Sequence, residues 1–320
     1  MLFLEDIFKI ALESSINEDP RGKKQVKELL EDVKEDYKNL SEKEKKFFDK
    51  EKLVNPYTDS RILFNSDKKT KIKRILAGID IGTEELLLAK ELTKSGNKID
   101  AVVAHHPLGV ARAQGLGEMM RIQEEIAIKW GVPINVVEKL MEPRIQEVVR
   151  ALAPGNNERC VDAAKLLNIP LMCLHTVADN HVHSYIEKFL QKKKVRKLGD
   201  ILDSLLEIEE YKIAASLGMG PDIYSGGKNS RVGKIAVTGM TGGTEGSEDI
   251  YERYAHAGVG TVIEMHISDS RKEKAKKFHL NVIMAGHMAS DSLGLNLMFD
   301  KIAKKGVEIV PCSGFIRVGR

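Results

Sequence analysis

The stretch Ala101-Val102-Val103-Ala104-His105-His106-Pro107 decides how this part of the chain folds. A short run of small and β-branched residues is typical of a strand that is buried on both faces of a parallel sheet. Proline has no amide hydrogen to donate to a sheet, so we expect the strand to end before Pro107. His105 and His106 then follow the carboxyl end of a buried strand, where open α/β sheets place their ligands. Because imidazole is a common ligand of first-row metal ions, the pair indicates a metal site.

The same alternation of strand, loop and helix extends in both directions from this stretch. We predict further strands at 74–79, 170–174, 233–238, 260–265, 281–285 and 307–311. Helices are predicted from Thr83, in several pieces between about 115 and 169, and at about 247–257, 268–278 and 290–305. Such alternation produces mostly parallel sheets with helical crossovers. The sequence therefore predicts an α/β fold with mixed, largely parallel sheets.

The first 66 residues have a different pattern. They are highly charged, and apolar residues between Val26 and Leu40 recur at helical spacing. We expect residues 1–66 to form a helical extension that packs on a first α/β domain, 67–195. A second α/β domain is expected at 196–320, whose last elements can pack on the first.

The run Lys192-Lys193-Lys194-Val195-Arg196-Lys197 marks the boundary between the two predicted domains. A solvated helix end or linker is the favoured interpretation. A nucleic-acid patch would need more cationic surface than a net charge of +3 provides.

Composition narrows the class of protein. With 320 residues, 42% hydrophobic and 30% charged, the chain can bury two cores of ordinary size. No apolar stretch approaches the roughly 18–20 residues that span a bilayer, and the N-terminus is too acidic for a signal peptide. We therefore expect no membrane contact and a cytoplasmic location. The three cysteines show no paired spacing, which argues against a disulfide framework and a zinc knuckle.

Polar side chains follow several of the predicted strands. Asp80 follows the first strand, and His175 and His287 follow two others. Asp179 and Asp291 each come four residues after such a histidine, so each pair can face one ion on a helix start. Imidazoles with carboxylates suit Zn, Mn or Fe, and carboxylates can bridge two ions.

A glycine-rich turn, residues 239–247, follows one strand and precedes a helix. Its Gly242, Gly243 and Thr244 can aim backbone amides at an anion such as a phosphate. The turn matches neither the Walker pattern nor a dinucleotide fingerprint, so a mere tight turn stays an alternative. Glu264 and His266, at the end of the 260–265 strand, are candidates for general acid/base catalysis or for an ordinary strand end.

In this order, the motifs resemble the Nif-three-like dinuclear metal-centre family, whose members are also described as GTP cyclohydrolase I type 2 homologues. The resemblance rests on Asp80, the 101–108 stretch, His175 with Asp179, and Ala285-Gly286-His287 with an acid four residues on. Segment 237–239 and its glycines resemble the family's second-domain signature. The similarity extends from about residue 72 to residue 320.

The resemblance implies two α/β domains with a two-metal site in the cleft between them. By motif match the metal ligands are His105, His106, Asp179, His287 and Asp291. The family usually has Glu at position 291, so the shorter Asp leaves bridging of both ions open. In that pattern His175 more often supports the site than binds metal. The resemblance also implies a homo-oligomer, often a ring-shaped hexamer.

Two functions follow from these observations. The first is a metal-dependent hydrolase with two divalent ions, acting on a nucleotide or another phosphorylated or cyclic C–N small molecule, of which GTP cyclohydrolase chemistry is one form. The second is a non-enzymatic metal-binding scaffold or partner-binding protein that works through the charged N-terminal helices. A nucleic-acid binder acting through 192–197 is the least favoured hypothesis.

Overall fold

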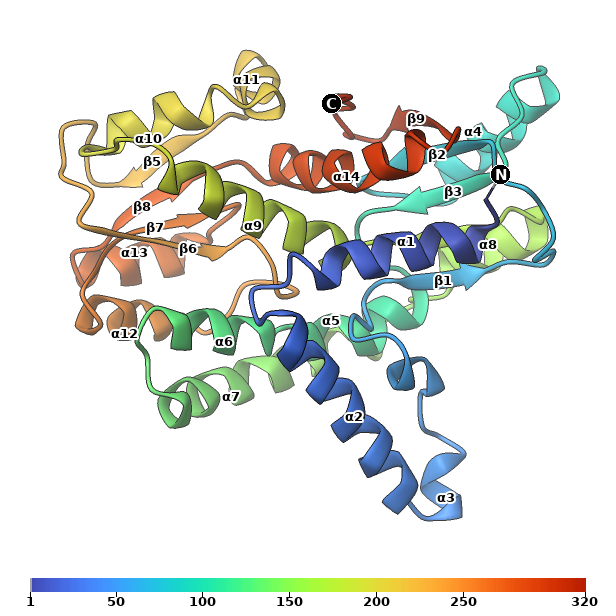
Figure 1. Ribbon diagram of the computed structural model, residues 1–320, viewed down its shortest axis with the longest axis horizontal. Helices are drawn as coiled ribbons and strands as arrows, with labels where there is room; N and C mark the ends of the chain where they lie inside the picture. Colours follow the sequence, from blue (N-terminus) through green and yellow to red (C-terminus); the bar gives the residue numbers. More distant parts are fainter. Residues whose placement is uncertain (1) are drawn as a thin grey trace.

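The computed structural model describes residues 2–320, which form two β-sheets with helices on both faces of each. In Figure 1 the first sheet lies on the right and the second on the left; α9 and α14 run between them, and α1 lies over the first sheet. Both sheets are mixed and largely parallel, as the sequence predicts.

The first sheet contains five strands in the order β1-β4-β3-β2-β9. β2, β3, β4 and β9 are parallel to their neighbours, whereas β1 runs antiparallel to β4 at the edge. The strands of this sheet are β1 Arg61–Phe64, β2 Arg74–Gly78, β3 Ala101–Ala104, β4 Leu171–Cys173 and β9 Glu308–Cys312.

The second sheet contains four strands in the order β5-β8-β7-β6. Here too one edge strand, β5, runs antiparallel to its neighbour while the others are parallel. Its strands are β5 Asp222–Ser225, β6 Lys234–Gly239, β7 Val259–Glu264 and β8 Asn281–Met284.

Helices connect the strands and cover the sheets. The α-helices are α1 Leu4–Ile16, α2 Lys23–Asn39, α3 Glu42–Lys45, α4 Thr83–Lys94, α5 Leu116–Met119, α6 Ile122–Lys129, α7 Ile134–Leu152, α8 Arg159–Leu167, α9 Thr176–Gln191, α10 Leu198–Leu205, α11 Glu209–Ser216, α12 Ile250–His256, α13 Asp269–Lys277 and α14 His287–Ala303. A 3-10 helix, η1, spans Lys50–Leu53, and a π-helical turn, η2, spans Ala111–Gly115. None of the helices in residues 2–320 combines the length and the apolar character that a membrane crossing requires.

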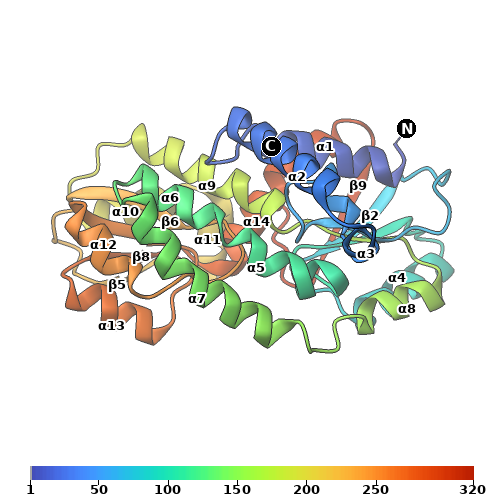
Figure 2. The same cartoon turned by 90° about the horizontal axis from the view of Figure 1, so that it is seen from below.

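The two halves share their packing helices. Apolar residues of α9 and α14 enter the core of the first sheet beside α1, and others enter the core of the second sheet beside α10 and α11. Helices α6 and α7 lie between β3 and β4 in the sequence, yet they pack on the second sheet together with α12 and α13. Figure 2 shows α6 and α7 extending beneath the second sheet. This interlocking fixes the carboxyl ends of the two sheets relative to each other.

The structure contains every strand predicted from the sequence, with ends that differ by at most one residue. Two strands lie outside the predicted set, β1 and β5, which are the antiparallel edge strands. β9 joins the first sheet next to β2 although it is the last strand of the chain. Helix α14 begins at His287, three residues before the predicted start at 290. The division of the chain at 66 and 195 stays a prediction.

The N-terminal segment has two parts. α1 packs against the first core, whereas α2, α3 and η1 form a hairpin that projects from the body, as Figure 1 shows. Val26 is the one buried residue of α2. Ser41 and Glu44 form the capping box that begins α3.

Candidate metal centre

Strand β3 delivers two histidines to the carboxyl edge of the first sheet. The amide of His105 donates to the carbonyl of Gly78 at 2.9 Å, and the amide of His106 donates to Ile79 at 3.0 Å. The sheet ladder therefore continues two residues beyond β3 and ends before Pro107, as proline chemistry requires. Both imidazoles are fixed at this edge by backbone hydrogen bonds.

His105 is completely buried and faces both acids of the site. Its Nδ1 lies 3.2 Å from the carbonyl oxygen of Leu174, which can only accept, so Nδ1 carries the proton. Its Nε2 lies 3.4 Å from Asp179 Oδ1 and 3.4 Å from Asp291 Oδ1. The lone pair of Nε2 therefore faces two carboxylate oxygens, and this arrangement is stable only if a cation or a proton lies between these atoms.

His106 and His287 flank the other oxygen of Asp291. The Nδ1 of His106 donates to Asp80 at 2.7 Å, which turns Nε2 toward Asp291 Oδ2 at 3.6 Å. The Nε2 of His287, in the first turn of α14, lies 3.5 Å from the same oxygen. The two rings are neighbours, with centroids 5.3 Å apart.

His175 is held by a residue of the N-terminal segment. Its Nδ1 donates to Asp59 Oδ2 at 2.8 Å, and Thr176 donates to the same oxygen at 2.7 Å. Ser60 Oγ accepts the amide of His175 at 2.9 Å. The Nε2 of His175 then faces Asp179 Oδ2 at 3.7 Å. A carboxylate that orients a histidine in this way is typical of metal sites.

Sequence analysis did not identify Asp59 as part of the site. Thr58-Asp59-Ser60 carries only turn signals, and the contact joins residues 116 positions apart. The structure also groups His175 with His105 and His106 as possible ligands, whereas the sequence predicts a supporting role for it.

The acids come from two helices that cross closely. Asp179 lies in the first turn of α9, and Asp291 lies one turn into α14. A Cβ added at Gly294 would lie 2.5 Å from the carbonyl oxygen of Ala178, so a side chain at this position would push the helices apart. Gly294 thus permits the approach that brings Asp179 and Asp291 together.

The donor set fits divalent metal ions. Four buried atoms of this cluster have no hydrogen-bond partner in residues 2–320: His105 Nε2, Asp179 Oδ1 and both carboxylate oxygens of Asp291. Such atoms are costly to bury unless a ligand completes them. Ligands at about 2.1 Å around a tetrahedral ion lie about 3.4 Å from one another, close to the 3.4–3.7 Å separations between imidazole and carboxylate atoms.

The ligand candidates form overlapping groups whose atoms lie within 4.8 Å of one another. His105, Asp179 and Asp291 form one group; His106, His287 and Asp291 form another. Asp291 is the residue that these two groups share. All five residues predicted as ligands are therefore brought together, and their binding of metal stays a prediction.

Burial and mutual charge set the protonation of the cluster. Burial lowers the pKa of His106, and burial lowers the pKa of His287 to about 4, so both imidazoles keep a free lone pair at neutral pH. Burial alone would raise the pKa of Asp291, but its histidine neighbours, His105 foremost, outweigh burial and lower it. Burial raises the pKa of Asp179. His106, His287 and Asp291 are thus in the states that bind metal, whereas the neighbouring carboxylates raise the pKa of His105 and that of His175, so that metal binding would release protons from these two imidazoles.

An open pocket of about 330 Å³ lies over the histidines. It is lined by Asp80, Ile81, His106, Pro107, Leu108, Arg112, Leu116, His175, Gly243, Thr244, His266 and His287. Its size is in the lower part of the range for small-molecule sites.

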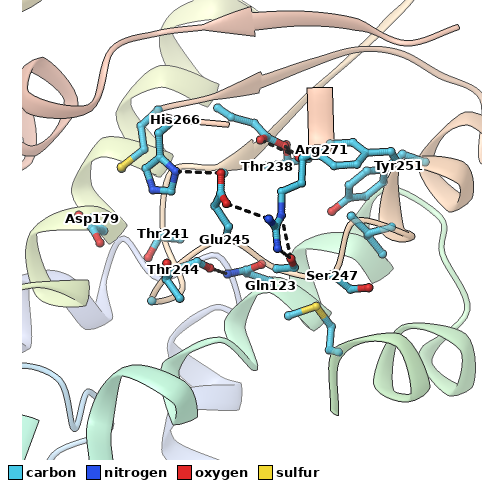
Figure 3. A pocket seen from close by; sticks show the side chains of 18 residues that line it. Gln123, Asp179, Thr238, Thr241, Thr244, Glu245, Ser247, Tyr251, His266 and Arg271 are labelled. Atoms are coloured by element: carbon cyan, nitrogen blue, oxygen red, sulfur yellow. Dashed lines mark hydrogen bonds and ion pairs between the residues drawn. The ribbon is translucent and has the colours of Figure 1, made fainter. Parts of the chain in front are cut away.

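The glycine-rich turn separates this pocket from a smaller cavity of about 60 Å³, shown in Figure 3. Gln123 of α6 donates to the carbonyls of Gly242 and Thr244 at 2.5 and 2.6 Å. Gly242 and Gly243 have φ angles of 93° and 78°, which favour glycine. Gly243 and Thr244 line both spaces, whereas Gly242 is buried against Gln123. Phosphate binding by this turn stays a prediction.

His266 and Glu264, the predicted acid/base residues, have different surroundings. His266 lines both spaces; its Nδ1 faces Glu245 Oε1 at 3.6 Å, and its ring centroid lies 4.6 Å from that of His287. Glu245 is in turn bound by Arg271 at 2.9 Å (Figure 3).

Glu264 is buried and lines only the smaller cavity. It accepts hydrogen bonds from Thr238 and Tyr251. Burial raises the pKa of Glu264.

Comparison with solved structures identifies proteins of similar fold. A NIF3 superfamily protein from Sphaerobacter thermophilus matches with a TM-score of 0.69 and 29% identity, over 80% of this chain and 91% of that chain. HcgD from Methanocaldococcus jannaschii, in its reduced form, matches with a TM-score of 0.47 and 14% identity, over 78% and 87%. A Bacillus cereus protein related to NIF3 matches with a TM-score of 0.42 and 11% identity, over 81% and 93%. No protein-family model and no curated protein matches the sequence.

Proposed function

Since the chain has the NIF3 superfamily fold, we propose that it is a metal-dependent hydrolase with two divalent ions at the His/Asp cluster. One observation supports this above all. Buried imidazole and carboxylate atoms from both halves of the molecule converge without hydrogen-bond partners. Zn, Mn and Fe are the ions that such donors favour.

In this proposal His105, His106, Asp179, His287 and Asp291 hold the ions. Bound divalent ions supply polarisation of the scissile group and activation of water near neutral pH. The pocket over the histidines admits a small molecule, and its wall of Gly243 and Thr244 contacts the substrate. The substrate class is a nucleotide or another phosphorylated or cyclic C–N compound, which includes GTP.

His266 is the acid/base residue in this proposal, because it borders the substrate pocket and lies beside His287. Glu245 faces its Nδ1, which leaves Nε2 to exchange a proton with the substrate. Glu264 has a supporting role, since its oxygens already accept from Tyr251 and Thr238.

Elemental analysis of natively purified protein, followed by turnover assays, tests the proposal. We expect about two Zn, Mn or Fe ions per chain and hydrolysis of at least one compound in a panel of GTP, phosphoesters and cyclic amides. His266→Ala should retain the metal and lose most turnover. If the metal-loaded protein hydrolyses no member of the panel, the proposed hydrolase activity is refuted.

The projecting hairpin of α2, α3 and η1 supports a second candidate, a metal-binding scaffold that binds a partner or further copies of itself. Phe47 and Val54 in this hairpin are 85% and 66% exposed, which is unusual for large apolar side chains. For this candidate we expect metal without turnover, together with a homo-oligomer that deletion of residues 23–54 disrupts.

A further inference from the structure

Two arginines without carboxylate partners lie beside the substrate pocket. Arg112 and Arg159 are exposed, and neither forms an ion pair or a side-chain hydrogen bond with any residue from 2 to 320. Most arginines of this chain are paired; Arg271, for example, is held by Glu245. An unpaired guanidinium in a concave site is a strong donor for a planar or tetrahedral anion.

Both arginines line a second pocket of about 270 Å³, which is adjacent to the first. The two pockets share Ile81, Leu108 and Arg112, so Arg112 stands between them. Arg159 lies at the far side, in the first turn of α8. The two pockets are therefore neighbours, with Arg112 in the wall of both and Arg159 in the wall of the second.

The second pocket also contains the start of α4, a helix of 12 residues. Its first turn carries Glu84 and Glu85, and Glu85 accepts the amide of Gly82 at 2.7 Å, so the positive potential of this pocket comes from the two arginines. Glu84 is the single carboxylate in the lining, and it is exposed. The net charge of the lining therefore favours an anion.

Local backbone structure holds Arg112 in this position. Arg112 lies in η2, the one π-helical turn in residues 2–320, and such turns are frequent at functional sites. A Cβ at Gly115 would lie 2.4 Å from the backbone of Thr58. The turn is thus packed directly against segment 58–60, which also holds His175.

We propose that this second pocket binds the phosphate tail of a substrate whose reacting group lies at the His/Asp cluster. The substrate class is a phosphorylated small molecule with a diphosphate or longer chain, held by Arg112 and Arg159. The position of the reacting group rests on the proposed function, whereas binding of the tail does not require the ions.

Inorganic pyrophosphate is the probe, titrated by calorimetry into metal-loaded and chelator-treated protein. Chelator-treated protein is decisive, because pyrophosphate can also bind metal ions directly. We expect both forms to bind it, and Arg112→Gln/Arg159→Gln to weaken binding to the chelator-treated form by roughly tenfold or more, since each guanidinium forms charge-assisted hydrogen bonds. Arg150→Gln is the matched control, an exposed and unpaired arginine on α7 that lines neither pocket. It should bind like the wild type.

The outcomes separate this proposal from the proposed function. If the double variant has normal metal content and binds pyrophosphate like the wild type, the phosphate-tail pocket is refuted. The proposed hydrolase activity is then unaffected. Chelator-treated wild-type protein that shows no binding at millimolar pyrophosphate overturns the pocket as well. If the protein binds no metal but binds pyrophosphate through the two arginines, the phosphate-tail pocket is supported and the proposed metal-dependent hydrolase is refuted.

Discussion

The two sheets of the molecule have a similar topology, but different side chains extend from them into the space between them. Each has an antiparallel edge strand, β1 or β5, followed along the chain by three parallel strands and a helix that carries His-X-X-X-Asp in its first turns. His175, which directly precedes α9, and Asp179 on α9 correspond to His287 and Asp291 on α14. The third strand position differs: β3 is followed by His105-His106, whereas β7 ends in Glu264, with His266 two residues further on.

The two halves therefore contribute different groups to the His/Asp cluster. The first half supplies most of the imidazoles, whereas the second half supplies Asp291, which both of the mixed ligand groups include. At the position of the His pair, the second half has a buried glutamate and a histidine that borders the substrate pocket. The two sheets therefore share the order of their strands and differ in the side chains that follow the third of these strands along the chain.

The largest expected effect comes from removing the ligands of either half. His106→Ala/Asp179→Ala and His287→Ala/Asp291→Ala should each lose most of the bound metal, because the site is built from both halves. Elemental analysis after gel filtration measures the content, and thermal unfolding followed by circular dichroism checks that folding stays cooperative.

The control for these variants is His266→Ala, which should retain wild-type metal. Two halves that bind independently would leave about half of the metal in each double variant. Retention of the full wild-type content in either double variant would refute the ligand assignment.

A smaller effect is expected at Asp59, which has no counterpart in the second half. It fixes the ring of His175, whereas His287 has no hydrogen-bond partner of this kind in the described residues. Asp59→Ala should lower metal affinity by roughly 10- to 100-fold, the usual cost of losing a carboxylate behind a ligating histidine. Competition with a chromogenic chelator measures the change.

Asp59→Asn should restore part of the affinity, since an amide oxygen can still accept from His175. Asp67→Ala, an exposed acid of the same segment, serves as the control and should have no effect. Wild-type affinity in Asp59→Ala would show that His175 is oriented by its backbone alone.

Local patterns in the sequence were sufficient to predict the parallel strands, and the resemblance to the Nif-three-like family supplied the five ligand candidates that the structure brings together. Short apolar runs that end at polar residues mark the strand ends, and parallel strands bring those ends to one edge. Contacts made by the N-terminal segment could not be predicted in this way. Asp59 lies in a turn-like stretch, and nothing local indicates that it contacts His175.

The edge strands were missed for a similar reason. β1, Arg61–Phe64, has only four residues, and it lies between turn-like and charged stretches of a segment that is otherwise helical. β5, Asp222–Ser225, does alternate between exposed and half-buried residues, a signal that period-two analysis can detect. Its charged first residue and short length concealed it.

The smallest expected effect is on the pH dependence of stability, in which α9 and α14 are expected to differ. His183 on α9 corresponds to Leu295 on α14; it is buried, and neither ring nitrogen has a hydrogen-bond partner in residues 2–320. Burial lowers the pKa of His183 to about 4 from its usual value of 6.5. The unfolded chain therefore binds more protons than the folded chain between pH 6.5 and 4, and stability falls as pH falls through this window. His183→Leu should reduce the loss of unfolding free energy between pH 7 and pH 5 by about 1–2 kcal/mol, measured by chemical denaturation.

His256→Leu, at an exposed position, should leave the pH dependence unchanged. Equal pH dependence in wild type and His183→Leu would show that the burial of His183 does not contribute to the acid sensitivity of the fold.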